Sequence, residues 1–357
     1  MRVLHTYCLN YNLGDYALGI GVKNLLRAFL PIDYIGETNI QGREFNEYYI
    51  NEVVNKRYDL LVIGGGGLIH GSHWPNGWFW LIDKELIKTI SIPYIVYGIG
   101  DNYFDDKDIP ERTIAHLTET YKYSKYFSVR NDGSFERVSR IFPFEPQEVP
   151  DPGFYTNYKT KNLIKRNIQE EYVVIQIAND KSKERFKTTE IMNIFIDELK
   201  KVVSYLSKNY KVIFVPHVFD DIEISKKIMD GINNCILVDY SKIAFDKSHE
   251  ILSYYKHAKF VLAMRGHGQI IPISYNVPTI ALCNHPKHSG LMNKLELYDN
   301  IEMIDESFSY VELLDKLSYL EDNYALHKEK LAMLNDNLEH QTKEAFQNIM
   351  DKLYSKD

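Results

Sequence analysis

The chain has 357 residues, of which 45% are apolar and 25% charged, and this average composition excludes a disordered, collagenous or coiled-coil protein. The 42 Lys and Arg residues stand against 49 Asp and Glu residues, so no overall basic field attracts nucleic acid. Three cysteines without CxxC spacing indicate neither a disulfide framework nor a zinc ribbon. Because no run of ~18 apolar residues and no signal-peptide pattern is present, we expect a cytoplasmic protein.

Short apolar runs and amphipathic stretches alternate along the chain. The first series begins with a predicted strand at 2–7 and a helix at 16–29, in which apolar side chains recur at helical spacing. Further strands are predicted at 59–63, 93–99, 126–130 and 148–151. These runs are apolar at nearly every position, which is typical of a parallel sheet covered by helices on both faces.

The alternation restarts after a stretch rich in Lys and Asn. The second series contains predicted strands at 172–178, 211–217, 235–240, 260–265 and 279–283, with helices at 190–207, 220–231, 249–256 and 267–275. Each βαβα series predicts a doubly wound three-layer domain. We therefore expect an α/β protein with two Rossmann-like domains that face a cleft, at 1–160 and 171–308, joined by a linker at 161–170 and followed by a helical segment at 309–357.

Ligands of open parallel sheets bind beyond the carboxyl ends of the strands, so the loops there are the places to search for chemistry. Asn12, Gly14 and Asp15 follow the first strand and open a helix, where free N–H groups suit an anion or a sugar; alternatively, Asp15 only caps the helix. Gly65 and Gly66 belong to a four-glycine run that lets the backbone approach a ligand or forms a tight turn. The dinucleotide and P-loop fingerprints are missing.

Cationic side chains also end predicted strands. Arg130 ends one of them, where its guanidinium suits a phosphate or carboxylate or else forms a structural ion pair. Arg265, Gly266 and His267 follow another strand and begin a helix. An imidazole at this position can exchange a proton at neutral pH, or it can serve packing alone.

Two further strand ends carry candidate ligand groups. Lys287 is a cation at the rim or a solvated lysine, and His217 either orients a group in the cleft or caps the next helix. His70 and His73 have no spaced cysteine or carboxylate partner, so we expect no metal. The residue types indicate no redox cofactor. Cations and a histidine gathered in an acidic chain predict a small anionic substrate, in the simplest case a phosphorylated one.

A series of landmarks runs through both halves in a fixed order: Asn12-x-Gly14-Asp15, Asp59-x-x-x-Ile63-Gly64-Gly65-Gly66, Val129-Arg130-x-Asp132, Asp151-Pro152, Arg265-x-His267, and Pro278 with Lys287. In this order and placement they resemble the motifs of the polysaccharide pyruvyl transferase family. Gly266 and Gly268 depart from that pattern, because a bulky residue usually precedes the family histidine and Ala or Ser commonly follows it. The resemblance implies two Rossmann-type domains in a GT-B-like arrangement.

The resemblance also implies an activity, the transfer of the carbon skeleton of phosphoenolpyruvate onto two hydroxyls of one sugar to give a cyclic ketal. Arg130, Arg265 and Lys287 would bind the donor, and His267 would act as acid or base. Gly266 and His217 are expected on the same donor side. Arg130, Arg265 and His267 are therefore our catalytic candidates.

The acceptor would lie against the N-terminal domain, at Asn12, Gly14, Asp15, Gly65 and Gly66. It would be a glycan, with a lipid-linked repeat unit as one option, so membrane contact would be peripheral and at the inner face. No cofactor besides the donor substrate is expected. The sequence makes no prediction of the oligomeric state, the acceptor sugar or the ketal position.

Two alternative functions stay open at this point. A GT-B nucleotide-sugar glycosyltransferase would show the same two domains and the same cationic strand ends, although no clear Glu-x₇-Glu clamp is present in the second domain. A non-catalytic glycan- or anion-binding protein would also fit, because a fold alone does not determine a function.

Overall fold

A computed structural model describes residues 1–10, 12–70, 74–102, 109–159, 168–238, 248–284 and 286–355, without the side chains of 248, 249, 251 and 286–288. The chain divides into two compact units. The first unit comprises Met1–Asn10, Asp15–Thr160 and Leu338–Asp357, and the second comprises Tyr11–Gly14 and Lys161–Asn337. The long C-terminal helix α13 (Tyr324–Tyr354) therefore contributes residues to both units.

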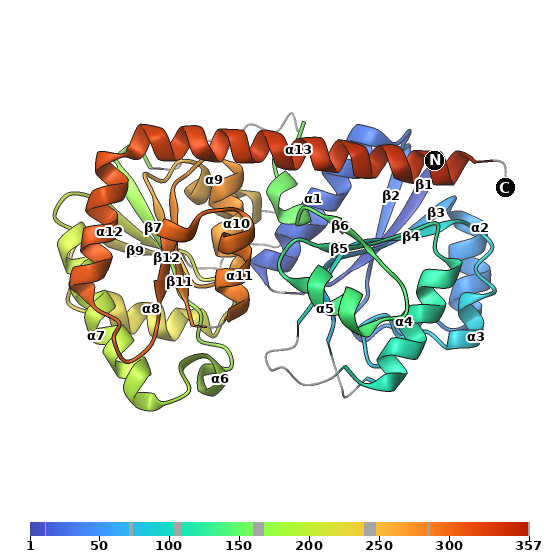
Figure 1. The fold of residues 1–357 in the computed structure, drawn as a ribbon, viewed down its shortest axis with the longest axis horizontal. Coiled ribbons are helices and arrows are strands. Elements are labelled where there is room, and N and C mark those ends of the chain that lie inside the picture. The colour runs from blue at the N-terminus through green and yellow to red at the C-terminus, as the bar shows by residue number, and fades with distance from the viewer. Residues whose placement is uncertain are drawn as a thin grey trace. The chain divides into compact units, whose positions relative to one another are not determined.

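The first unit is built on a parallel sheet of six strands in the order β2-β1-β3-β4-β5-β6. Helices lie on both faces of this sheet, as a doubly wound fold requires (Figure 1). The strands are β1 (Arg2–Tyr7), β2 (Tyr34–Asn39), β3 (Leu60–Ile69), β4 (Tyr94–Asp101), β5 (Tyr126–Arg130) and β6 (Gln147–Val149). The helices are α1 (Leu13–Phe29), η1 (Tyr49–Val54), α2 (Asn55–Arg57), α3 (Lys84–Ile87), α4 (Glu111–Tyr123), α5 (Ser134–Ile141) and η2 (Pro152–Tyr155).

The second unit repeats this plan with the strand order β12-β11-β10-β7-β8-β9, and its strands are again parallel. Its strands are β7 (Tyr172–Gln176), β8 (Lys211–Phe214), β9 (Cys235–Leu237), β10 (Val261–Ala263), β11 (Thr279–Cys283) and β12 (Ile301–Met303). Its helices before α13 are α6 (Ser182–Phe186), α7 (Thr189–Leu206), α8 (Asp221–Met229), α9 (Ser248–Lys256), α10 (Gly266–Ser274), α11 (Pro286–Lys294), η5 (Tyr298–Asn300) and α12 (Tyr310–Asp322).

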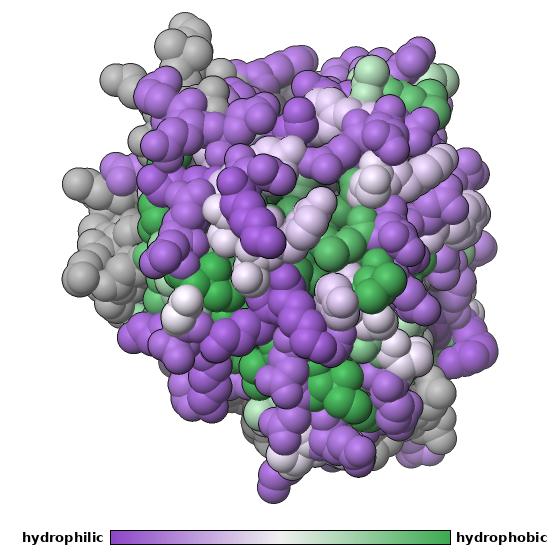
Figure 2. Space-filling view, turned by 90° about the vertical axis from the view of Figure 1, so that its left-hand side faces the viewer, coloured by the Kyte–Doolittle hydropathy of each residue, from purple (hydrophilic) through white to green (hydrophobic). Residues whose placement is uncertain are grey.

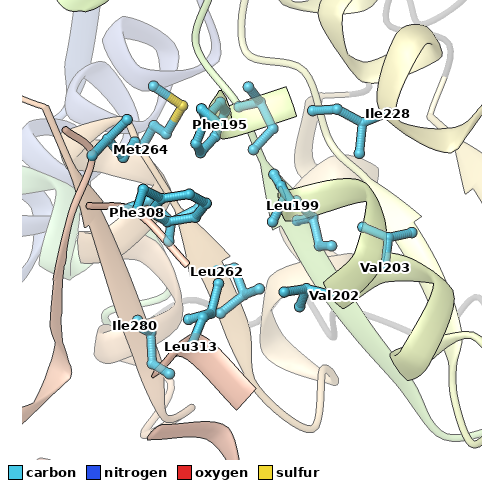
Figure 3. Packing of buried hydrophobic residues seen from close by; sticks show 14 of the residues in the cluster. Phe195, Leu199, Val202, Val203, Ile228, Leu262, Met264, Ile280, Phe308 and Leu313 are labelled. Atoms are coloured by element: carbon cyan, nitrogen blue, oxygen red, sulfur yellow. The ribbon is translucent and has the colours of Figure 1, made fainter. Parts of the chain in front are cut away.

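The core of the second unit shows why these sequences form these layers. Helix α7 begins after Thr188, whose side chain accepts a hydrogen bond from the Ile191 N–H (3.2 Å), and it buries a stripe that includes Phe195 and Leu199. Figure 3 shows this stripe facing Leu262 of β10, together with residues of β11 and of α12. Burial of the apolar stripe of α7 against this face of the sheet is a main stabilising contribution in the unit.

One face of the surface is mainly hydrophilic. Figure 2, viewed from the side where α7 and α12 lie in Figure 1, shows polar residues interrupted by separate apolar patches. Within the part of the chain that the structure describes, none of the helices combines the length and the apolar character needed to cross a bilayer.

The predicted α/β class is confirmed, because each series of apolar runs forms one parallel six-stranded sheet with helices. The sequence analysis missed two strands, β2 and β12, which both lie at sheet edges. The last residues of the strand predicted at 235–240 fall partly outside the described residues.

Candidate functional site

Each sheet has one point where the strand order reverses, and polar loops gather at the carboxyl ends of the strands there. In the second unit this point lies between β10 and β7, which are hydrogen-bonded neighbours. Arg265 follows β10 directly before α10, and Asp180 lies in the loop between β7 and α6. Neighbouring parallel strands therefore bring together two side chains that are far apart in the sequence.

The guanidinium of Arg265 is held by two carboxylates. Its Nε and Nη2 donate to Oδ2 and Oδ1 of Asp221 at 2.9 and 2.6 Å, and Nη2 also donates to Oδ1 of Asp180. The backbone N–H of Arg265 donates to Oε1 of Gln176 at 2.8 Å. Its third nitrogen, Nη1, has no hydrogen-bond partner among the described residues, so a ligand has one guanidinium nitrogen to bind.

Asp221 anchors this cluster at the start of α8. Its side chain is 0% exposed and accepts hydrogen bonds from the backbone N–H groups of Asn179 (3.1 Å), His217 (3.0 Å) and Val218 (3.2 Å). Three main-chain donors and the bidentate contact with Arg265 fix its orientation. Burial alone would lower the pKa of Arg265, but Asp221 and Asp180 outweigh that effect and raise it.

His267 lies in the first turn of α10, beside backbone N–H groups that the helix leaves without intrahelical partners. The two neighbouring glycines differ in their surroundings. A Cβ at Gly268 would lie 2.9 Å from Oε1 of Gln176, whereas a Cβ at Gly266 would meet nothing within 4 Å. The departure at Gly268 is therefore explained by close packing, and nothing described near Gly266 explains why it is glycine.

His217 lies in the loop between β8 and α8 and is 0% exposed. Its Nε2 is hydrogen-bonded to the hydroxyl of Tyr255 at 2.6 Å. Burial, and then the charges of Arg265 and His267, lower the pKa of His217 well below its ordinary value. The ring is therefore neutral at neutral pH, and it lies inside the unit beneath the Arg265 cluster.

The sequence segment after β1 contributes residues to the second unit as well. The Leu13 N–H donates to the carbonyl oxygen of His217 at 3.0 Å, and a Cβ at Gly14 would lie 2.7 Å from Nδ1 of His267. Oδ1 of Asn12 accepts a hydrogen bond from the Gly14 N–H at 2.9 Å. Gly14 was predicted to bind the acceptor and His267 to act on the donor. The two residues are thus neighbours within the second unit.

Arg130 belongs to the first unit, where it ends β5. It forms ion pairs with Asp132 (Nε to Oδ2, 2.7 Å) and Asp151 (Nη1 to Oδ2, 3.1 Å). Burial would lower its pKa, but Asp132, Asp151 and the more distant Asp15 together raise it. The ion pair considered as an alternative role for Arg130 is present. Whether Arg130 and Arg265 bind one ligand stays a prediction.

The four-glycine run lies at the reversal point of the first sheet, between β1 and β3. Gly64, Gly65 and Gly66 have φ values of +135°, +56° and +115°, which favour glycine. A Cβ at Gly64 would also lie only 2.2 Å from the carbonyl oxygen of Tyr97. Close packing against β4 therefore requires glycine at Gly64, independently of any ligand.

A buried histidine supports this run. Nε2 of His5 donates to the carbonyl oxygen of Gly64 at 2.7 Å, and burial lowers the pKa of His5 to about 4. The nearby candidate Asp15 accepts a hydrogen bond from Nδ2 of Asn10 at 2.9 Å. A Cβ at Gly66 would lie 4.0 Å from Oδ1 of Asp15, so these two candidates are neighbours in the first unit, whereas Asn12 and Gly14 group with the second.

Lys287 lies in α11, and its side chain is outside the described residues, as is the whole of His73. In the described ranges, no group of three or more His, Cys, Asp or Glu side chains could hold a metal ion. The sequence analysis did not single out Asp180, Arg185 or Asp221 as site residues. Asp180 carried a usable signal, because it lies two residues after a predicted strand.

Comparison with known proteins now gives this arrangement a context. The family model described as polysaccharide pyruvyl transferase matches residues 12–286, which is more than half of the chain. A search of curated proteins finds no match.

Solved structures resemble the chain over almost its whole length. A Listeria monocytogenes protein provisionally described as a UDP-N-acetylglucosamine 2-epimerase has 13% identity and a TM-score of 0.62, covering 99% of this chain and 96% of its own. The Methanocaldococcus jannaschii UDP-GlcNAc 2-epimerase has 13% identity and a TM-score of 0.53, covering 89% and 92%. A calicheamicin glycosyltransferase has 11% identity and a TM-score of 0.52, covering 99% and 98%. These likenesses confirm the predicted GT-B-like fold and, at such identities, nothing more.

Proposed function

The chain belongs to the polysaccharide pyruvyl transferase family, and from that premise we propose that it is a transferase that uses phosphoenolpyruvate to form a pyruvate ketal. The acceptor is a sugar in the repeat unit of a surface or capsular polysaccharide. The observation that carries the proposal is the family match over residues 12–286, which includes Arg130, Arg265 and His267, each at the carboxyl end of a strand or in the turn that follows.

The reaction balances without any oxidant or reductant. A proton is added to the methylene carbon of phosphoenolpyruvate, which becomes the methyl group, and one sugar hydroxyl adds to the neighbouring carbon. The bond between that carbon and the phosphate oxygen then breaks, and a second hydroxyl of the same sugar closes the ring. Of the two hydroxyl protons, one replaces the proton given to the methylene carbon and the other leaves with phosphate. The proposal therefore includes no cofactor.

The described geometry supports roles for two residues. Among the described residues Nη1 of Arg265 has no hydrogen-bond partner, while Asp221 fixes the rest of the guanidinium, so Arg265 can bind a donor oxygen without reorienting. His267 lies in the next helical turn, beside backbone N–H donors that favour negative charge. We assign His267 the proton transfer, and Arg265 the stabilisation of negative charge on the donor.

The proposal also assigns roles to the remaining predicted residues. Arg130 and Lys287 are further donor ligands, and Asp15, Gly65 and Gly66 belong to the acceptor side. The acceptor glycan is attached to a lipid carrier, so the enzyme works in the cytoplasm at the inner face of the membrane with peripheral contact only.

The test is incubation of the purified chain with phosphoenolpyruvate and a panel of candidate acceptor sugars. Phosphate release is measured together with the mass of the sugar, which must increase by one pyruvate less one water. His267→Ala serves as the inactive control. Phosphate release without a change in the sugar mass, or no release with any acceptor, would contradict the proposal.

A thermal-shift comparison separates this function from a nucleotide-sugar glycosyltransferase. A ligand present at a hundredfold excess over its Kd stabilises the folded state by ~2.7 kcal/mol. We expect stabilisation by phosphoenolpyruvate and none by UDP- or GDP-sugars. The reverse pattern would favour the glycosyltransferase, and binding of a glycan without turnover would favour a binding protein.

A further inference from the structure

Two arginines of the second unit converge on a single oxygen atom. Nη2 of Arg265 and Nη2 of Arg185 both donate to Oδ1 of Asp180, the latter at 3.1 Å. Arg185 also donates from Nε to the main-chain oxygen of Asp180 at 2.8 Å, which holds its guanidinium beside the loop after β7. Arg185 is itself buried within α6.

The two carboxylates on Arg265 are held very differently. Asp221 is 0% exposed and accepts from three backbone N–H groups, so it cannot leave without disrupting the loop before α8. The side chain of Asp180 is 29% exposed, and among the described residues its carboxylate contacts only the two arginines. Asp180 is therefore the partner that another anion can replace.

The charge balance supports such a replacement. With Asp180 in place, two arginines and two aspartates sum to 2 − 2 = 0. With the Asp180 carboxylate turned away, Arg185, Arg265 and Asp221 sum to 2 − 1 = +1, and two guanidinium groups face the vacated position. Paired guanidiniums suit the oxygens of phosphate and carboxylate groups because each can donate two parallel hydrogen bonds.

We propose that Arg185 and Arg265 form an anion clamp, and that Asp180 occupies it until an anionic group of the donor replaces its carboxylate. The identity of the donor rests on the proposed function, and the clamp itself rests on the convergence of the two arginines. Arg185 is then a donor-binding residue, and Asp180 competes with the donor and tunes its affinity.

Competition predicts opposite effects for the two members. Asp180→Asn keeps the size of the side chain and removes the competing charge, so the Kd for phosphoenolpyruvate should fall roughly tenfold. Arg185→Gln removes one arm of the clamp, so the Kd should rise roughly tenfold or more. Glu184→Gln is the matched control, because it removes the same charge from an exposed neighbour and should leave the Kd unchanged.

The experiment is titration calorimetry of the full chain with phosphoenolpyruvate and, separately, with inorganic pyrophosphate, after circular dichroism has shown that each variant is folded. If Asp180→Asn does not fold, Asp180→Ser takes its place. Tighter binding by the Asp180 variant together with weaker binding by Arg185→Gln supports the clamp. Unchanged or weaker binding by the Asp180 variant overturns it, as does unchanged binding by Arg185→Gln.

The second probe separates the clamp from the proposed function. If pyrophosphate follows the expected order of affinities while phosphoenolpyruvate does not bind the wild-type chain, the clamp stands and the proposed donor is wrong. If phosphoenolpyruvate binds and is turned over but the variants do not follow that order, the function stands and the clamp is wrong. If neither probe binds, the clamp is overturned.

Discussion

Asp221→Asn is the substitution whose effect on stability can be worked out most fully from the structure. Oδ2 of Asp221 accepts from the N–H groups of His217 and Val218 and from Nε of Arg265, while Oδ1 accepts from the Asn179 N–H and from Nη2 of Arg265. Donors face both oxygens, so an asparagine turns its NH₂ group toward donors in either orientation. The substitution therefore loses the negative charge together with at least two of these five hydrogen bonds.

The size of the effect follows from the partner left behind. Removing one member of a buried ion pair costs about 3–5 kcal/mol, because the other charge stays buried without compensation. Asp180 still contacts Arg265 and offsets part of this cost, so we expect the lower end, about 3 kcal/mol of unfolding free energy.

Urea unfolding followed by circular dichroism measures this loss, with Asp220→Asn as the matched control. Asp220 precedes Asp221, is exposed and makes no side-chain cap contact, so its substitution should change the free energy of unfolding by less than about 0.5 kcal/mol. A loss below about 1 kcal/mol for Asp221→Asn would refute the argument that this carboxylate is the anchor of Arg265.

Three other substitutions test separate parts of the structure. His267→Ala should lower kcat by about 10²–10⁴ in the phosphate-release assay without changing the melting temperature, and a near-normal kcat would remove His267 from the mechanism. Gly64→Ala should destabilise the first unit by about 3 kcal/mol or more in urea, because the Cβ meets the Tyr97 carbonyl at positive φ. Since the pKa of His5 is about 4 when folded and 6.5 when unfolded, the unfolded chain takes up the proton first as pH falls, so up to about 3 kcal/mol of stability is lost between those values. His5→Gln should flatten that pH dependence, and an unchanged slope would contradict the assignment.

The fold was predictable where strands are buried on both faces. β3, β4 and β7 are almost entirely buried, and their continuous apolar sequences carried that information. β2 was not predicted because its burial is uneven, with Tyr34 and Glu37 exposed at the sheet edge. β12 is a three-residue edge strand with Glu302 at its centre, and so short a run carries no hydrophobic pattern.

The sequence predicted which site residues follow each strand, but not which of these residues come together in the fold. The sequence places Arg265 and His267 after a strand, and the structure keeps them there. It does not say which strands are neighbours, so it could not bring Asp180 from the loop after β7 and Asp221 from the start of α8 onto the same arginine. That contact depends on the strand order β10-β7-β8. In this order β8 and β10 lie on either side of β7, although they are not consecutive in the sequence.

The same chemistry occurs in both units, with one difference that bears on function. Arg130 and Arg265 each end a strand or directly follow one, and each is held by two carboxylates. The partners of Arg130 have side chains that are 10% and 0% exposed, so neither can leave for a solvent-borne anion at low cost.

Asp180, at 29% exposure, has access to solvent that the partners of Arg130 lack. An arginine whose two counter-ions are both buried is a structural element first, and binding to it requires either a neutral partner or an unused nitrogen. An arginine with one replaceable counter-ion is preorganised for an anion. Its positive charge is balanced by that counter-ion until the anion binds. By this argument we expect the proposed clamp of Arg265 and Arg185 to bind an anion more tightly than Arg130 does.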